Sequence, residues 1–177
     1  MAAFFLIVAA VLSRIFPDPA WFNFTAVGGA LLYFGARRPL RQLWIPVAAL
    51  AATDYYLTTF YYGYAFHLSG YLLTWAWYAA VIVLGYILLS RKTSVSRVAA
   101  GVAIAPTSFF LITNFAAWAM MPQLYPHTLG GLGLSYAAGL PFYRNDLMST
   151  AIVAALAFGL PALARQMQQR HQVASAA

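Results

Sequence analysis

Three acidic side chains stand out as candidates for chemistry, because Asp18, Asp54 and Asp146 are the only carboxylates in the side chains of this sequence. Of the 177 residues, 63% are apolar and 7% are charged, whereas about 25% of residues are charged in soluble proteins. So few charges could not cover a surface that faces water, and we therefore expect a membrane protein. An acid in a lipid bilayer is costly and usually has a functional or structural partner.

Two charged residues are predicted to lie deep in the bilayer. Counted from the starts of their apolar segments, Arg14 lies roughly 18 Å deep and Asp54 roughly 16 Å deep, at about 1.5 Å per residue. A lone charge there costs at least about 2.5–3.5 kcal/mol. We predict that Arg14 and Asp54 pair with each other, or that each pairs through Arg144 or Asp146. Such a pair could fix the helix register, could form the polar floor of a ligand cavity, or could do both.

Further polar and aromatic residues, near the ends of the apolar segments, are candidates for contact with a ligand. For Asn114 the alternative is a bond to a neighbouring backbone group, and for Trp118 it is an anchor at the membrane surface. Asp146 could cap the start of the last helix. With Arg14 and Asp54, the residues expected to contact a ligand are Asn114, Trp118, His127, Tyr136, Arg144 and Asn145.

The fold predicted to position these residues is all-α, with six transmembrane helices. The apolar segments cover approximately residues 2–16, 22–36, 43–62, 70–89, 98–121 and 147–164. One transmembrane domain over 1–165 and a cytoplasmic tail over 166–177 follow from this pattern. Residues 129–142 are apolar, but they are rich in glycine and too short to span. We predict that they form a re-entrant or interfacial segment, which folds back over the helices as a lid.

Basic residues set the predicted orientation. Eight of the ten fall at one side of a six-span topology, and the positive-inside rule makes that side cytoplasmic. Both termini are then cytoplasmic, the three aspartates lie in the outer half, and the location is a bacterial inner membrane. The eight residues are Arg37, Arg38, Arg41, Arg91, Lys92, Arg97, Arg165 and Arg170. Because they form short clusters between apolar segments, we expect no nucleic acid partner.

Enzyme motifs are missing from the sequence. Cysteine is absent, which excludes disulfides, thiolate metal sites and cysteine nucleophiles. There is no G-x-S-x-G, phosphate-binding loop or G-x-G-x-x-G. His67 and His127 lack the spacing of metal ligands, so we predict no metal. We expect a protein that is not an enzyme, and the sequence leaves the question of a cofactor open.

The second half of the chain carries a recognisable pattern. It comprises Thr113-Asn114-Phe115 followed by Trp118, then Tyr125-Pro126-His127-Thr128, then Pro141-Phe142-Tyr143-Arg144-Asn145. This TNFxxW…YPxT…PFxRN pattern resembles a bacterial integral membrane family without assigned function. The resemblance covers most of the chain and implies membership of that family, but it implies no activity.

The predicted architecture also resembles the substrate-binding S components of energy-coupling-factor vitamin transporters. These have six helices, cytoplasmic termini and a ligand cavity closed by outer loops. The resemblance implies a membrane-embedded protein for small-molecule binding or uptake, with the ligand among the outer loops. The alternative is a non-catalytic subunit of a larger membrane complex. The expected partners are membrane lipids, a small-molecule ligand and possible other membrane subunits.

Overall fold

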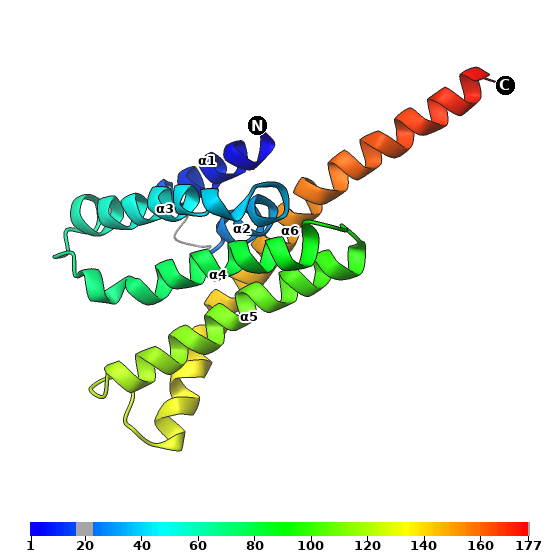
Figure 1. Ribbon diagram of the computed structural model, residues 1–177. Coiled ribbons are helices and arrows are strands. Elements are labelled where there is room, and N and C mark those ends of the chain that lie inside the picture. The colour runs from blue at the N-terminus through cyan, green and yellow to red at the C-terminus, as the bar shows by residue number, and fades with distance from the viewer. Residues whose placement is uncertain (17–22, 177) are drawn as a thin grey trace.

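The chain folds into helices joined by short connections (Figure 1). The computed structural model describes residues 1–16 and 23–176, and these contain no strand. Single 3-10 turns occur at Leu40–Gln42 and Leu68–Gly70, and a π-helical turn, Leu57–Tyr61, prolongs α3. The predicted all-α fold is confirmed. The helices are α1 (Ala2–Ile15), α2 (Val27–Arg37), α3 (Trp44–Tyr56), α4 (Leu72–Leu89), α5 (Val95–Met120) and α6 (Leu129–Ala176).

Helix length and apolarity fit a membrane protein. Among the described residues, α4, α5 and α6 are each long and apolar enough to cross a bilayer. By contrast, α1 has 14 residues and α2 has 11, which gives lengths of about 21 Å and 16 Å. A hydrocarbon core is about 30 Å thick. Six complete spans therefore stay a prediction.

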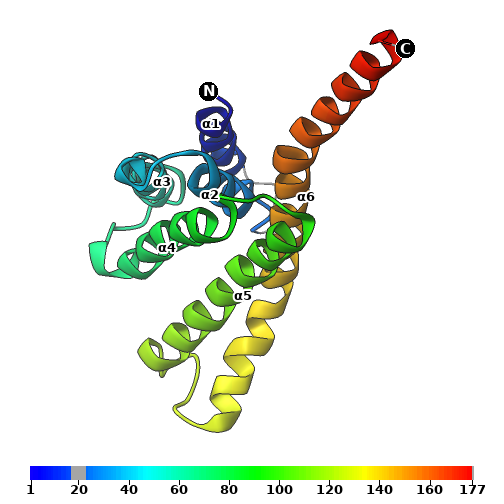
Figure 2. The ribbon, with the colours of Figure 1, turned by 45° about the vertical axis from the view of Figure 1, so that its right-hand side comes forward.

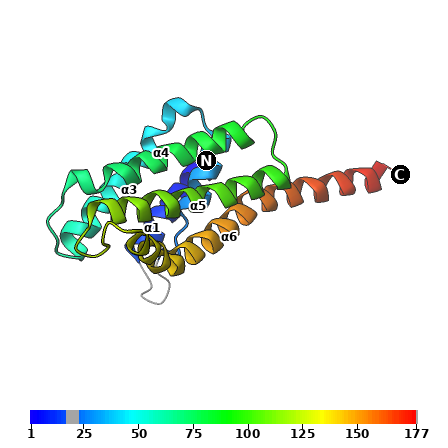
Figure 3. The same ribbon diagram turned by 90° about the horizontal axis from the view of Figure 1, so that it is seen from below.

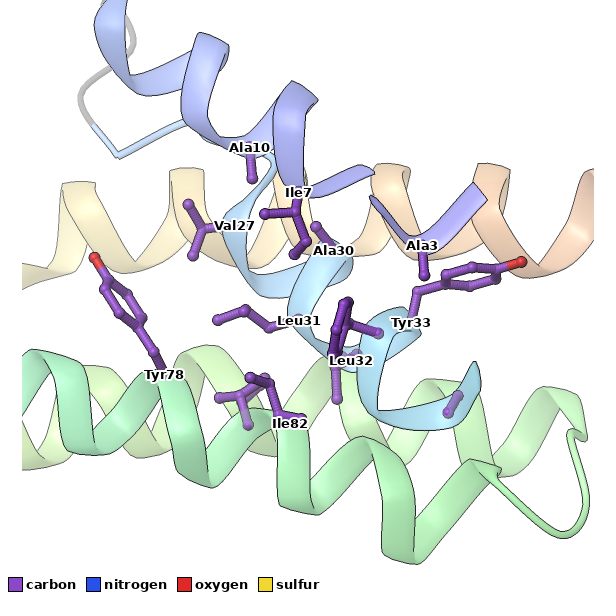
Figure 4. Close-up of a cluster of buried hydrophobic side chains, with 14 of the residues drawn as sticks. Ala3, Ile7, Ala10, Val27, Ala30, Leu31, Leu32, Tyr33, Tyr78 and Ile82 are labelled. Carbon is purple, nitrogen blue, oxygen red and sulfur yellow. The ribbon is translucent and has the colours of Figure 1, made fainter. Parts of the chain in front are cut away.

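Helix α2 lies at the centre of the fold. All residues from Val27 to Ala36 are buried, and α2 contacts α1, α4, α5 and α6. Figure 4 shows Leu31 and Leu32 of α2 between Ile7 of α1 and Ile82 of α4. A helix that is apolar on every side is stable only when neighbours surround it. The apolar core of the protein is therefore built around α2.

Two glycines allow α2 and α4 to pack at close range. A Cβ atom on Gly35 would collide with the carbonyl oxygen of Ile82, and one on Gly85 would collide with that of Leu32. Lipid provides no hydrophobic drive for helices to associate, so close packing of small residues supplies much of the attraction. The crossing of α2 and α4 therefore depends on these two positions.

Helices α5 and α6 form an antiparallel hairpin (Figures 1, 2 and 3). The Thr107 and Tyr143 hydroxyls lie 2.9 Å apart, and Tyr136 donates a hydrogen bond of 3.0 Å to the Leu111 carbonyl oxygen. The tip of the hairpin projects away from the core in one direction, while the C-terminal part of α6 projects in the opposite direction (Figure 2).

The prediction of a separate fold-back segment at 129–142 is wrong. These residues form the first four or so turns of α6. Two of the glycines in this segment pack closely against neighbours: Gly131 lies against Pro126, and Gly139 lies against Asn114 of α5. In lipid, glycine often serves as a contact residue within helices. Residues 166–176, predicted to be a tail, also continue the α6 helix.

The basic clusters meet at one end of the fold. The Arg37 guanidinium, at the end of α2, lies 3.5 Å from the hydroxyl of Thr93, between α4 and α5. This contact brings the α2–α3 and α4–α5 connections together. The Arg37 guanidinium is also 5.8 Å from the Phe158 ring of α6, and that of Arg38 is 4.7 Å from the Phe4 ring of α1. The start of α1 and the C-terminal part of α6 therefore lie at this end too.

A matched pair of glycine substitutions tests the α2–α4 contact. Gly85→Ala should lower the free energy of unfolding by about 1–3 kcal/mol, because the new methyl group overlaps the α2 backbone. Gly159→Ala on α6 should be neutral or stabilising by up to about 1 kcal/mol, since nothing lies within 4 Å of its added Cβ. Denaturant unfolding in detergent micelles measures both, and equal effects would contradict the packing argument.

Candidate functional site

An ion pair joins α1 to α3 inside the fold. Nη2 of Arg14, in the last turn of α1, lies 2.5 Å from Oδ1 of Asp54 on α3. The Asp54 side chain is 3% exposed and that of Arg14 is 19% exposed. The direct pairing predicted from the sequence is confirmed.

Aromatic side chains of α4 complete the environment of the pair. The indole nitrogen of Trp75 donates to Oδ2 of Asp54 at 2.9 Å, and Nη1 of Arg14 donates to the Tyr78 hydroxyl at 3.0 Å. Both Asp54 oxygens therefore have partners, which offsets the cost of removing the charges from water. Trp75 and Tyr78 were not among the residues predicted from the sequence. They lie three residues apart on an apolar helix and so share one face, and this spacing is the feature that could have identified them.

A cavity of about 250 Å³, here called the main cavity, lies beside the ion pair. Asn23, Thr25 and Val27 line it, so it lies at the N-terminal end of α2. The walls facing the polar groups include Arg14, Asp54, Tyr71, Trp77, Tyr78 and Asp146.

A second cavity of about 140 Å³, here called the side cavity, lies between α5 and α6. Its lining includes Asn114 and Pro106 of α5 with Tyr143 of α6. Three residues, Asn23, Phe109 and Asp146, line both cavities. The two cavities are therefore neighbours that share a wall.

Asp146 forms part of that shared wall. It is 8% exposed, and within the described residues its carboxylate has one side-chain hydrogen-bond partner, the Thr150 hydroxyl at 3.4 Å. The expectation that Asp146 caps the start of a helix is wrong, because α6 begins at Leu129. Asp146 is instead a buried residue within α6 that lines both cavities, and it is therefore part of the candidate site.

Aromatic rings make up much of the main cavity's lining. Trp77 of α4 and Phe109 of α5 pack with ring centroids 4.6 Å apart. Tyr71 stacks on Trp75 at 6.1 Å, and its hydroxyl bonds that of Thr58 in the π-helical turn. Such rings can bind apolar, planar or cationic groups. Within residues 1–16 and 23–176, no three His or Asp side chains gather as a metal site would require.

Three of the predicted ligand-contact residues line the cavities. Arg14 and Asp54 line the main cavity, and Asn114 lines the side cavity while its amide donates to the Phe110 carbonyl oxygen at 2.8 Å. Asn145 is buried on α6, next in sequence to Asp146, whereas the Arg144 side chain is exposed.

Three further predicted residues make hydrogen bonds within the α5–α6 hairpin. Trp118 donates from its indole nitrogen to the Pro126 carbonyl oxygen at 3.0 Å, and Nε2 of His127 lies 3.2 Å from the Ala119 carbonyl oxygen. Tyr136 bonds the α5 backbone, as described above. Asp18 lies outside the described residues.

Comparison with known proteins gives one match. Residues 1–173 match a family of unknown function (DUF6580). This finding agrees with the predicted resemblance to an uncharacterised family. No curated protein matches the chain, and no solved structure matches it. The likeness to transporter S components therefore stays a prediction.

Substitutions at the ion pair should be strongly non-additive. Asp54→Asn leaves Arg14 buried without its counter-charge and should cost about 3–5 kcal/mol of unfolding free energy. The double variant Arg14→Met with Asp54→Leu removes both charges and should recover most of that loss. Tyr78→Phe is a control that deletes only the neutral hydrogen-bond partner of the Arg14 guanidinium and should cost about 1.5–3 kcal/mol. Unfolding in detergent measures all three, and a double variant as unstable as Asp54→Asn would refute the coupling.

Proposed function

We propose that this chain, which belongs to the family of unknown function DUF6580, is a membrane-embedded protein that binds a small molecule and takes part in its uptake. The ligand would occupy the main cavity and extend toward the side cavity. The proposal includes no catalytic step. The carrying observation is a cavity of about 250 Å³ beside buried charged and aromatic side chains.

The form of the cavity supports binding over a purely structural role for its polar groups. A salt bridge that only fixed helix register would need its partners and close packing around them, because unfilled space lowers stability. Here Arg14 and Asp54 have their partners, yet open space remains beside them, and Asp146 also faces it. Ligand sites typically combine apolar walls with a few such polar groups.

The α5–α6 hairpin is the proposed gate of the cavity, in place of the lid expected from the sequence. Pro106 lies inside α5 and Pro141 inside α6. The adjacent bond between Thr107 and Tyr143 puts the two prolines at a similar level of the hairpin. Proline removes a backbone hydrogen bond and favours bending. We therefore place a hinge at this level, on the wall of the side cavity.

For the location, we propose the bacterial inner membrane, with the basic end of the protein in the cytoplasm. The support is the meeting of the basic clusters at one end and the positive-inside rule. Membrane lipids would then surround the exposed apolar faces of the helices. Both termini would lie on the cytoplasmic side.

Cysteine labelling tests this orientation cleanly, because the chain has no cysteine of its own. Ser69→Cys and Ser96→Cys put the same thiol at exposed serines, one beside the start of α4 and one at the start of α5. A maleimide that cannot cross membranes should label Ser69→Cys in intact cells and Ser96→Cys only after permeabilisation. The reverse pattern would overturn the proposed orientation.

A cavity-filling variant tests the binding proposal. Thr74 of α4 lines the main cavity, and Thr74→Trp should fill it. The neighbouring Leu73 is 40% exposed, so Leu73→Trp serves as a control with the same new side chain. Native mass spectrometry and extraction of the purified protein should find a small molecule in the wild type and in Leu73→Trp, and should find it depleted in Thr74→Trp. A wild-type protein that retains nothing, or a Thr74→Trp variant that retains as much, would contradict the proposal.

A second candidate is a non-catalytic subunit of a larger membrane complex. The observation that favours it is a cluster of exposed aromatic residues at the α3 end, which could face another chain as well as lipid. In the same native mass spectra, a stable assembly with other chains and no small molecule would favour this candidate. The cluster comprises Tyr55, Tyr56, Phe60, Tyr61, Tyr62 and Tyr64.

A further inference from the structure

The charges that line the main cavity do not balance. Within its described lining, Arg14 is the one basic residue, and Asp54 and Asp146 are acidic. Arg14 is already engaged by Asp54 and by the Tyr78 hydroxyl. Residues 17–22, outside the described part of the chain, contain Asp18 and no Lys, Arg or His in the sequence. With its carboxylates ionised, the described lining therefore carries one net negative charge, located on Asp146.

Asp146 has too little local support for a buried carboxylate. It is 8% exposed, and its side-chain partner within the described residues is a single neutral hydroxyl at a long 3.4 Å. Asp54, by comparison, has a guanidinium and an indole N–H on its two oxygens. A buried charge without a counter-charge is strongly unfavourable. A cationic group in the cavity would supply the counter-charge that the described residues do not provide for Asp146.

The rest of the cavity wall suits an organic cation. Trp77 and Phe109 pack against each other there, and Tyr71 and Tyr78 add further rings. Aromatic faces attract cations through their quadrupole, and tryptophan does so best. The volume of about 250 Å³ lies just below the usual range for ligand pockets, about 300–1,000 Å³. The occupant should therefore be small.

We infer that the main cavity binds a small organic cation, a protonated amine or a quaternary ammonium, with its positive nitrogen facing Asp146 and its carbon groups against the aromatic wall. This inference rests on the proposed binding function and specifies its ligand class. Arg14 and Asp54 then act as a neutral pair that shapes the floor of the cavity. The selective charge is Asp146.

Two pairs of probes with matched shapes test the ligand class by calorimetry in detergent. Butylammonium is compared with butan-1-ol, and choline with 3,3-dimethylbutan-1-ol, so each pair differs mainly in charge. In the wild type, at least one cation should bind at least about tenfold more tightly than its neutral partner. Asp146→Asn should weaken that cation by at least about tenfold and leave the alcohol unchanged. Asp146→Glu, which keeps the charge, should retain the preference for the cation.

The wild-type comparison decides the inference even if Asp146→Asn fails to fold. Alcohols that bind as tightly as the cations, with binding abolished by Thr74→Trp, would overturn the cation inference and leave the binding proposal standing. A wild type that binds none of the four probes would also overturn the inference, while a co-purifying molecule lost in Thr74→Trp would still support the binding proposal. An unchanged cation affinity in folded Asp146→Asn would remove Asp146 from its assigned role.

Discussion

A charge inside a bilayer must find its partner within the protein, because lipid provides none. Arg14 meets this requirement through Asp54 on α3 and Tyr78 on α4, and Trp75 of α4 binds the other oxygen of Asp54. The network thus joins three helices at one level. Apolar contacts alone set helix register weakly in lipid, where side chains and solvent are equally apolar. The pair therefore links α1 to α3, and its two hydrogen bonds with α4 link both helices to a third.

The packed core around α2 adjoins the space beside that network. This helix is buried from Val27 to Ala36 and approaches α4 through glycine contacts. It is also short, and the main cavity lies at its N-terminal end, between the ion pair and Asp146. A closely packed core and a candidate binding site therefore lie next to each other, the core along α2 and the cavity at its N-terminal end.

The α5–α6 hairpin shows that glycine can serve as a contact residue within a helix. Residues 129–142 are apolar and rich in glycine, and they form a helix whose small residues allow contact with α5 and with the preceding connection. Trp118 and Tyr136 stabilise the hairpin by bonding to backbone carbonyl groups. Trp118 belongs to the sequence pattern TNFxxW…YPxT…PFxRN, whereas Tyr136 does not. At Trp118 the pattern therefore coincides with a contact that stabilises the hairpin.

The sequence alone predicted the all-helical class, the approximate positions of five of the helices and a partner for each buried charge, because apolar runs and the cost of a lone charge in lipid are local properties of the chain. It did not predict that residues 129–142 begin the last helix, and it left open whether Arg14 pairs with Asp54 directly. It did not determine that Trp75 and Tyr78 would complete the pair, that Asp146 would face a cavity, or that Arg144 would be exposed. Those outcomes depend on which faces of distant helices meet. Only the tertiary structure decides this, because a helix surrounded by lipid carries little polarity to mark its inward side.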